Sequence, residues 1–431
     1  MFENISGAIM SESTLLKDLA RRCKAASKVV AQLSSNDKNA LLLAMADHLV
    51  VAEQSIIEEN IKDVQNAQKN GLSDAMIDRL VLDSPRIAKM ANALRDIAAL
   101  ADPVGAITET WRRPNGLEVS YRRIPLGVIG MIYESRPNVT SDAAGLCLKA
   151  GNAVYLRGGS EAFFSNHAIA RILHKVLESF KIPIAAITLV PTTERSAIAE
   201  MLAFSDEIDV VIPRGGEGLI RFVTENSHIP VIKHYKGVCH QYVDDNADID
   251  MAINLLIDGK CSRPGVCNAL ETLLVHNDIA SVFLPRAESA LTDRGVEIRG
   301  CPGTLQYVSH AKAATEEDFY EEFLAPILAV RVVNDLDGAI QHIATYGSDH
   351  TEVIVTKDYA HAREFTRRVN SSVVLVNASS RFSDGGELGL GAEIGISTTK
   401  LHAYGPMGLE SLTTKKFVVQ GSGQTRHASN S

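Results

Sequence analysis

The first hundred residues carry apolar side chains at the spacing of helices. Residues 40–50 form an alanine- and leucine-rich run that follows Ser34–Asp37, a cluster of short polar side chains typical of a helix N-cap. An apolar stripe at helical spacing then continues to Val64, and glycine and serine residues end it near residue 71. A further helix is expected over residues 85–100. The pattern therefore predicts a helical start to the chain.

The pattern changes after Pro103. Residues 117–124 alternate polar and apolar side chains, which favours an extended hairpin. Compact apolar runs bounded by turn residues then alternate with amphipathic stretches, of which residues 169–180 are the clearest. The runs lie at residues 127–133, 153–156, 187–190 and 209–212. Continuous apolar strands between such helices indicate a parallel sheet that is covered on both faces.

The second half of the chain repeats this alternation. Its apolar runs lie at residues 272–275, 327–333, 352–355 and 373–376. They predict a second α/β domain that begins near Gly237. The tail from Gly421 is polar and is expected to be flexible.

Composition narrows the class of protein. The chain has 431 residues, too many for one ordinary core, and its net charge of −9 without a basic run argues against a nucleic-acid partner. Residues 1–14 lack the basic and apolar regions of a secretory signal, and no apolar run approaches the ~20 residues of a membrane span. The six cysteines include no CxxC pair, so we expect free thiols in a reducing cytoplasm, with neither disulfides nor a metal site.

Two glycine-rich turns follow predicted strands. The first contains Arg157 and Gly158, and the second contains Arg214, Gly215 and Gly216. Such turns let backbone N–H groups approach a phosphate at the start of the next helix. Neither turn matches a dinucleotide or P-loop fingerprint, and either one alone is also consistent with a tight connection that binds nothing. The pairing of two turns, each beside an arginine, favours phosphate binding.

Two further residues are candidates for covalent chemistry. Cys267 lies in a loop with Pro264 and Gly265, where a thiolate can be exposed and stabilised by N–H groups, although most free cysteines are buried small hydrophobes. Asn138 follows a strand and precedes a helix, so its side chain either caps that helix or donates to an oxyanion. His234 and His240 lack the further ligands that a metal pair would need.

Taken together, the motifs resemble the aldehyde dehydrogenase superfamily, because they follow in that superfamily's order from the asparagine loop to the segment Glu322–Pro326. Within it, the chain is similar to the γ-glutamyl phosphate reductase family over nearly its whole length. The most specific stretches are residues 125–140, 210–216, 237–244, 333–354 and 384–398.

This resemblance implies a reaction and a set of roles. L-Glutamate 5-phosphate and NADPH would give L-glutamate 5-semialdehyde, phosphate and NADP through a cysteine thioester, as a step of proline biosynthesis. The nucleophile would be Cys267 and the oxyanion donor Asn138. The cofactor would be bound by Arg157, Gly158, Ser160, Arg214, Gly215, Gly216 and Glu322, the last at the nicotinamide ribose.

Two departures from the wider superfamily refine this hypothesis. His234 falls where oxidising members carry the glutamate that activates water, and an enzyme that exchanges phosphate has no use for such a base. Ser160 replaces the glutamate that binds the ribose 2′-OH in NAD-preferring members, which leaves room for a 2′-phosphate beside Arg157 and predicts NADPH over NADH. Arg136 and two further loop arginines, Arg263 and Arg381, are candidates to bind the substrate's anionic groups or to form salt bridges.

The resemblance also implies an architecture. We expect an aldehyde dehydrogenase-like α/β fold with a Rossmann-type NADPH-binding domain at residues 1–108 and 124–236 and a catalytic domain at 237–402. A small β extension for oligomerisation would combine residues 109–123 and 403–420, followed by a flexible tail at 421–431. A homodimer or homotetramer is expected, association with glutamate 5-kinase is left open, and nucleic-acid and membrane partners are not expected. A phosphate-independent, NAD-linked aldehyde dehydrogenase and a catalytically inactive scaffold are the alternatives.

Overall fold

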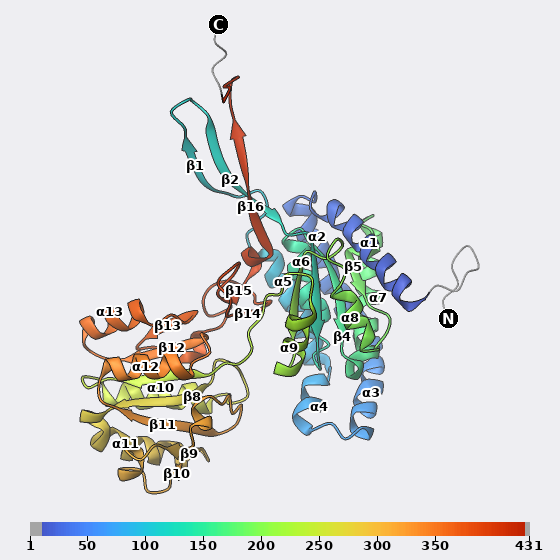
Figure 1. The fold of residues 1–431 in the computed structure, drawn as a ribbon. Coiled ribbons are helices and arrows are strands. Elements are labelled where there is room, and N and C mark those ends of the chain that lie inside the picture. Colours follow the sequence, from blue (N-terminus) through green and yellow to red (C-terminus); the bar gives the residue numbers. More distant parts are fainter. Residues whose placement is uncertain (1–10, 427–431) are drawn as a thin grey trace. The chain divides into compact units, whose positions relative to one another are not determined.

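The computed structural model describes residues 11–426 and divides the chain into two compact units (Figure 1). Unit 1 comprises Met1–Ile232, Leu390–Gly395 and Met407–Ser431, and unit 2 comprises Lys233–Gly389 and Ile396–Pro406. The chain therefore leaves unit 1, builds unit 2, and returns to unit 1 near its end.

Unit 1 is built on a four-stranded parallel sheet in the order β5-β4-β3-β6. The strands are β3 (Val128–Tyr133), β4 (Ala153–Gly158), β5 (Ile187–Leu189) and β6 (Val210–Arg214). All six residues of β3 are buried. This confirms the prediction, made from its continuous apolar run, that the strand is covered on both faces. Because the strands are parallel, the turns after β3, β4 and β6 lie at the same edge of the sheet.

Helices cover both faces of this sheet. The helices of unit 1 are α1 (Glu12–Val30), α2 (Ser35–Val51), α3 (Glu53–Lys69), α4 (Asp74–Leu80), α5 (Ser84–Ala99), α6 (Val139–Lys149), α7 (Phe163–Ser179), α8 (Ser196–Met201) and α9 (Glu217–Asn226). Leu16 and Ala20 of α1 pack with Val128 and Tyr155 of the sheet, while α6 and α7 contact β4 and β5. The predicted cap of α2 is present as a capping box, in which Ser34 and Asp37 bond each other's backbone N–H.

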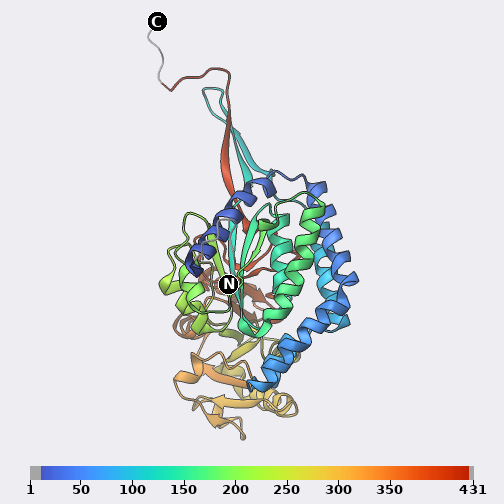
Figure 2. The same ribbon diagram turned by 90° about the vertical axis from the view of Figure 1, so that its right-hand side faces the viewer.

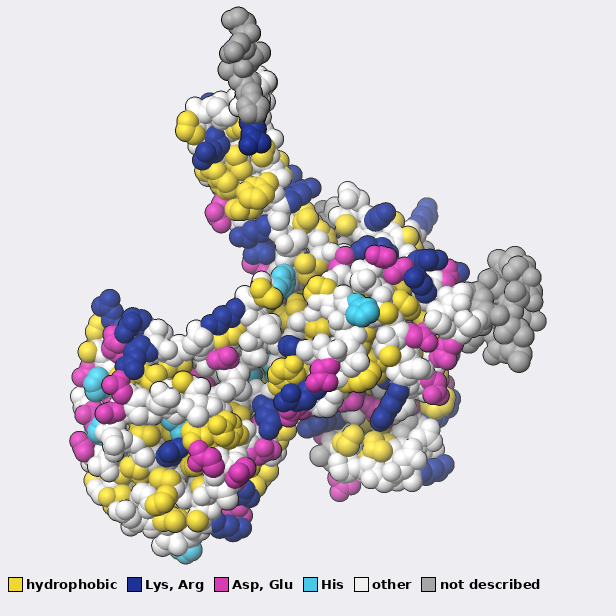
Figure 3. All heavy atoms as spheres, viewed as in Figure 1, with side chains coloured by type: hydrophobic (Ala, Val, Ile, Leu, Met, Phe, Trp, Pro, Cys, Tyr) yellow, Lys and Arg dark blue, Asp and Glu magenta, His cyan; other side chains and the backbone are white. Residues whose placement is uncertain are grey.

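Three antiparallel strands project from the helical body of unit 1 (Figure 2). They are β1 (Ile107–Arg112), β2 (Glu118–Pro125) and β16 (Thr413–Gln420), in the order β1-β2-β16. The pairing of the hairpin with the strand near residues 415–419 follows the prediction, with Phe417 opposite Tyr121. The rings of Tyr121 and Phe417 lie 4.5 Å apart, with Trp111 beside them, and hydrophobic side chains gather on this extension in Figure 3.

Unit 2 is a seven-stranded parallel sheet in the order β10-β9-β11-β8-β7-β12-β13. The strands are β7 (Cys239–Val243), β8 (Leu270–His276), β9 (Glu297–Gly300), β10 (Lys312–Ala313), β11 (Ile327–Val333), β12 (Thr351–Val355) and β13 (Val373–Val376). Side chains alternate between two cores. Cys239 and Val243 pack against α10 (Ile249–Cys261) and α11 (Asn277–Thr292), whereas Tyr242 packs against α12 (Leu336–Tyr346) and α13 (Tyr359–Arg368).

Three strands of unit 2 were not expected from the sequence. β9 and β10 are short and carry charged side chains, and β7 has His240 and Gln241 at its centre. Both of these polar residues are fully buried, and hydrogen bonds to Glu352 and to the carbonyl of Ala252 satisfy His240 Nδ1 and Gln241 Nε2. A polar buried strand gives no apolar run to recognise.

Two further observations concern the ends of the chain and the helices. The prediction that residues 1–14 form no secretory signal falls mostly on residues outside the described range. The predicted flexible tail is described only to Arg426. In the described range, no individual helix has the length and apolar character to cross a bilayer; α2 and α3, joined at a bend of 69°, meet the criterion only as a pair.

Candidate active site

The turn after β3 places Asn138 at the start of α6. Asn138 occupies the N-cap position, but its side chain makes no capping bond; instead Nδ2 donates to Asp142 Oδ2 at 2.8 Å. Burial raises the pKa of Asp142 to about 6. Of the two roles left open by the sequence, side-chain capping is therefore not the one adopted. The second N–H of the same amide remains chemically suited to an oxyanion.

Arg157, at the end of β4, has a buried guanidinium. Its Nη2 donates to the carbonyls of Thr193 and Glu194 at 2.8 and 3.2 Å, and Nη1 donates to Gly158 at 3.2 Å. Only 6% of the residue is exposed, and burial lowers its pKa. Arg157 thus holds the loop after β5 in place. Its predicted contact with the cofactor stays a prediction.

Two carboxylates connect the turns at this edge of the sheet. Glu161, after β4, accepts from the backbone N–H and hydroxyl of Ser135, after β3. Glu134 Oε2, also after β3, accepts from the backbone N–H of Gly216 at 3.1 Å, at the N-terminus of α9. A carboxylate therefore sits where a helix N-terminus favours an anion.

The second glycine turn has the space that a dinucleotide phosphate needs. A Cβ added to Gly216 would meet no atom within 4 Å, whereas one added to Gly215 would overlap the Glu134 carboxylate. Gly216 is exposed at the start of a ten-residue helix. These residues fit a diphosphate once it displaces the Glu134 carboxylate, because backbone N–H groups at a helix N-terminus are its usual ligands.

Ser160 lies on an open surface of unit 1. It is exposed, and it lines a cavity of about 410 Å³ together with Glu134, Ser135 and Glu161. The remaining lining residues come from the end of α3, the segment that follows it and the start of α4. The position can therefore accept a larger side chain or a ligand group.

In unit 2, Cys267 lies on the loop between α10 and β8. It is partly exposed, while its neighbour Asn268 is buried. The Cys267 carbonyl accepts from Cys239 Sγ at 3.2 Å, and Gly237 packs directly against the Cys267 backbone. Cys267 is therefore not a fully buried core residue, and contacts with Cys239 and Gly237 fix its main chain.

The segment with Glu322 is anchored to the strand that follows Cys267. Glu271, on β8, accepts from the backbone N–H of Leu324 at 3.2 Å and pairs with Lys260 at 2.5 Å. Both charged side chains are fully buried; burial raises the pKa of Glu271 to about 7 and lowers that of Lys260. The pair holds the Glu322 segment beside the cysteine loop, where Gly265 approaches the Leu324 carbonyl.

The predicted site residues are thus distributed over both units. Unit 1 carries the following, all at one edge of its sheet: Asn138, Arg157, Gly158, Ser160, Arg214, Gly215 and Gly216. Unit 2 carries Cys267 and Glu322 on adjacent segments. Each set is assembled within its own unit.

Several supporting residues were missed from the sequence. None of Glu134, Glu161, Glu271 and Cys239 is singled out by the sequence pattern. A carboxylate one to three residues beyond a buried strand would have been a usable signal for Glu134 and Glu161. For Glu271 and Cys239, which lie within strands, no local pattern points to the contact.

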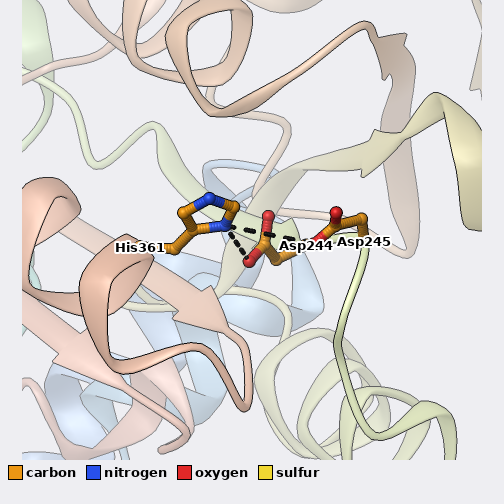
Figure 4. A group of neighbouring side chains, drawn as sticks. All are labelled: Asp244, Asp245 and His361. Carbon is orange, nitrogen blue, oxygen red and sulfur yellow. Dashed lines mark hydrogen bonds and ion pairs between the residues drawn. The ribbon is translucent and has the colours of Figure 1, made fainter.

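One further group of side chains could hold a cation by geometry alone. Asp244, Asp245 and His361 bring their ligand atoms within 4.8 Å, the sole such group among residues 11–426 (Figure 4). Asp244 is already satisfied by the hydroxyls of Tyr242 and Thr356 and by His361 Nδ1 at 2.7 Å. The group therefore ties α13 to the end of β7.

Comparison with known proteins identifies the family. The chain matches the aldehyde dehydrogenase family over residues 10–297. It is 63% identical to the γ-glutamyl phosphate reductase of Salinibacter ruber, over 97% of this chain and 96% of that protein, and 60% identical to that of Geotalea daltonii, over 97% and 100%. The crystal structure of γ-glutamyl phosphate reductase from Thermotoga maritima superposes with a TM-score of 0.94 at 42% identity, covering 96% and 100% of the two chains. The chain therefore belongs to the aldehyde dehydrogenase family and, within it, to the γ-glutamyl phosphate reductases.

Proposed function

We propose that this enzyme reduces L-glutamate 5-phosphate to L-glutamate 5-semialdehyde with NADPH, releasing phosphate, in proline biosynthesis. The observation that carries the proposal is the high identity to named γ-glutamyl phosphate reductases over nearly the full chain. A partly exposed Cys267 on a fixed loop supports it, because the reaction needs an accessible nucleophile.

The covalent chemistry belongs to Cys267. Its thiolate attacks the acyl carbon, the carbonyl oxygen gains negative charge, and the Asn138 amide and the Cys267 N–H are the proposed donors to that oxygen. Loss of one such donor typically costs about 3–4 kcal/mol of transition-state stabilisation. Phosphate leaves as the carbonyl re-forms, which gives a thioester on Cys267.

The second half of the reaction reduces this thioester. Bound NADPH supplies the hydride. The resulting hemithioacetal anion collapses to the aldehyde and returns the electron pair to the Cys267 sulfur. By the order of the motifs, His234 stands where oxidising members carry their hydrolytic glutamate, and this replacement supports reduction over hydrolysis.

For the cofactor, we propose the turn after β6 as the diphosphate site. The Gly216 N–H stands at the exposed N-terminus of α9, and the Glu134 carboxylate that accepts from it would yield to the more highly charged diphosphate. Glu322 is the proposed ligand of the nicotinamide ribose. A distant relative of the same fold, an engineered glycolyl-CoA reductase, was solved with bound NADP+.

The preference for NADPH is proposed from Ser160. Its small exposed side chain leaves room for a 2′-phosphate, and no carboxylate is present at this position to repel it. Arg157 is the proposed source of positive charge. Arg195 is exposed on the loop that Arg157 fixes, close enough for its charge to lower the pKa of Arg157, and it adds to that charge.

Arginines also accompany the nucleophile. Arg263 is exposed in the Cys267 loop, and the carbonyl of Arg381 accepts from the Asn268 side chain at 3.4 Å. We propose that these two, with Arg136 of unit 1, bind the substrate phosphate and α-carboxylate, since guanidinium forks match both groups.

Oligomerisation is proposed through the β extension. Phe417 and Val419 expose 60% and 54% of their surface there, so an apolar face is left for a second copy of the chain. A homodimer or homotetramer follows from this proposal. Association with glutamate 5-kinase is proposed only because the acyl phosphate is labile.

The decisive experiment runs the reaction backwards. Glutamate semialdehyde should reduce NADP+ only when phosphate is present, monitored as absorbance of NADPH at saturating aldehyde. Cys267→Ser should bind NADPH unchanged but lose about 100-fold or more in turnover. Phosphate-independent oxidation, with NAD+ preferred, would instead establish a hydrolytic aldehyde dehydrogenase, and failure to bind NADPH at all would indicate an inactive scaffold.

A further inference from the structure

We infer that Cys239 and His350 are positioning residues for Cys267, acting through a ring of buried, uncharged hydrogen bonds. This inference rests on the proposed function only in taking Cys267 as the nucleophile. Every member of the ring lies in unit 2, and together they fix the peptide that joins Cys267 to Asn268.

The ring begins at the Cys267 carbonyl. Cys239 Sγ donates to that oxygen at 3.2 Å, from the first residue of β7. Cys239 is fully buried, and burial raises the pKa of its thiol well above the usual range. It therefore stays protonated at neutral pH, which makes it a hydrogen-bond donor and unsuited to being a second nucleophile.

The imidazole of His350 supports the Cys239 thiol. Its Nδ1 lies 3.6 Å from Cys239 Sγ and 2.8 Å from Thr351 Oγ1. Because the Thr351 hydroxyl donates its hydrogen to Ser383 Oγ at 2.8 Å, it must accept from His350, so Nδ1 carries a hydrogen, which it shares between Thr351 Oγ1 and, at the longer distance, Cys239 Sγ. Burial lowers the pKa of His350 to about 3, so the ring stays neutral and this tautomer is fixed.

Asn268 closes the ring. Its Nδ2 donates to the Ser383 carbonyl at 2.9 Å, and its own carbonyl accepts from Ser380 Oγ at 2.7 Å. The peptide after Cys267 is thus held on one side by Cys239 and on the other by the segment 380–383. Side chains from β7, β12 and the 3₁₀ turn Ser380–Phe382 meet there, so three separate elements define one position.

Such a ring has a specific catalytic consequence. It pins the Cys267 main chain while leaving the side chain partly exposed, and the contacting groups carry no charge that would oppose a neighbouring thiolate. A shift of about 1 Å in a reacting group can cost on the order of 100-fold in rate. Loss of the Cys239 donor should therefore lower kcat and change Cys267 reactivity without weakening substrate binding.

Substitution of Cys239 tests this directly. Cys239→Ala should lower kcat about tenfold or more with KM for the acyl phosphate little changed, and should shift the pH profile of Cys267 alkylation by iodoacetamide, followed by mass spectrometry of that peptide. Cys239→Ser keeps a donor and should restore most of kcat. Cys301→Ala, at a partly buried cysteine elsewhere in unit 2, is the control and should change none of these.

His350 provides a second, independent arm. In His350→Asn the amide nitrogen takes the place of Nδ1, so Cys267 alkylation and kcat should stay near wild type, whereas His350→Gln places its amide near Nε2 and should behave like Cys239→Ala. Equal losses for Asn and Gln, or no rescue by serine at position 239, would show a packing role and overturn the inference. The alkylation readout needs no turnover, so it remains decisive if Cys267 proves not to be the nucleophile of the proposed reaction.

Discussion

The two units hold their functional residues in different ways. In unit 1, the turns after the strands are connected by exposed or half-buried carboxylates, with Glu134 accepting from the N–H of Gly216 and Glu161 from that of Ser135. In unit 2, the Cys267 peptide is held by buried, uncharged groups such as Cys239. A site proposed for an anionic cofactor can contain carboxylates, because the cofactor can displace them. A site proposed for a thiolate is better supported by uncharged hydrogen-bond donors.

Ion pairs also stabilise unit 2, but they hold segments other than the peptide of Cys267, the proposed nucleophile. The buried pair of Lys260 and Glu271 fixes Leu324, and the pair of His361 and Asp244 fixes α13. The comparison therefore makes graded predictions: buried charged supports should govern stability, the neutral ring should govern rate, and the exposed turn residues should govern cofactor choice.

The largest expected effect is on stability, at Lys260. Lys260→Met leaves Glu271 buried without its partner, which should cost about 3–5 kcal/mol of unfolding free energy. Arg286→Met breaks an ion pair with Asp250 whose side chains are 51% and 76% exposed, so it should cost under about 1 kcal/mol. Urea denaturation of both variants measures the difference; equal costs would mean that the buried pair gives no special support.

The next effect is on rate, at Gly237. A Cβ there would overlap the Cys267 carbonyl and lie 2.9 Å from its Cα, so Gly237→Ala must displace the backbone of Cys267, the proposed nucleophile. We expect kcat to fall about 100-fold with NADPH affinity unchanged. Gly216→Ala, where a Cβ meets nothing, should leave the fold intact and weaken NADPH binding instead. Single-turnover kinetics measures the loss of rate, and cofactor titration measures the loss of NADPH affinity. If Gly237→Ala weakened NADPH binding and Gly216→Ala lowered kcat instead, the roles assigned to the two units would be exchanged.

The contrast between units also explains what the sequence revealed. Buried strands such as residues 127–133 and the glycine turns carry local signals, namely a continuous apolar run and residues that allow a close backbone approach. Cys267 and Asn138 were found through the order of motifs. The fold was therefore accessible from the sequence, whereas the roles given to Cys267 and Asn138 stay predictions.

The supporting contacts were not accessible, because they join residues far apart in the chain. Cys239 and Cys267 are 28 positions apart, and Cys239 and His350 are 111 apart. Nothing in the local pattern around Cys239 distinguishes a buried hydrogen-bond donor from a small hydrophobe. The strand β7 was missed for the same reason, since its central residues are polar, and the partners of His240 Nδ1 and Gln241 Nε2 lie on β12 and α10.

A smaller effect is expected on cofactor choice, at Ser160. Ser160→Glu introduces a carboxylate at an exposed position that now leaves room for a 2′-phosphate. Repulsion of that phosphate should shift the ratio of kcat/KM for NADPH over NADH about tenfold or more toward NADH. Ser160→Gln, of similar size but uncharged, is the control for crowding. If the ratio of kcat/KM for NADPH over NADH stays unchanged in both variants, another position recognises the 2′-phosphate.

The smallest effect is a pH dependence at the far end of β7, away from Cys267 (Figure 4). The hydrogen bond that His361 donates to Asp244 raises the pKa of His361 above its ordinary value of about 6.5. Because the folded-state pKa is the higher one, the stabilisation is fully present below about pH 6.5 and is lost as the pH rises through the raised value. The side chain is 37% exposed, so the contribution should be under about 1 kcal/mol. Urea denaturation of the wild type and His361→Asn across that range should show a stability difference that shrinks with rising pH. A difference that stays constant would mean that His361 supports α13 by packing, and that protonated imidazole contributes no charged support to unit 2.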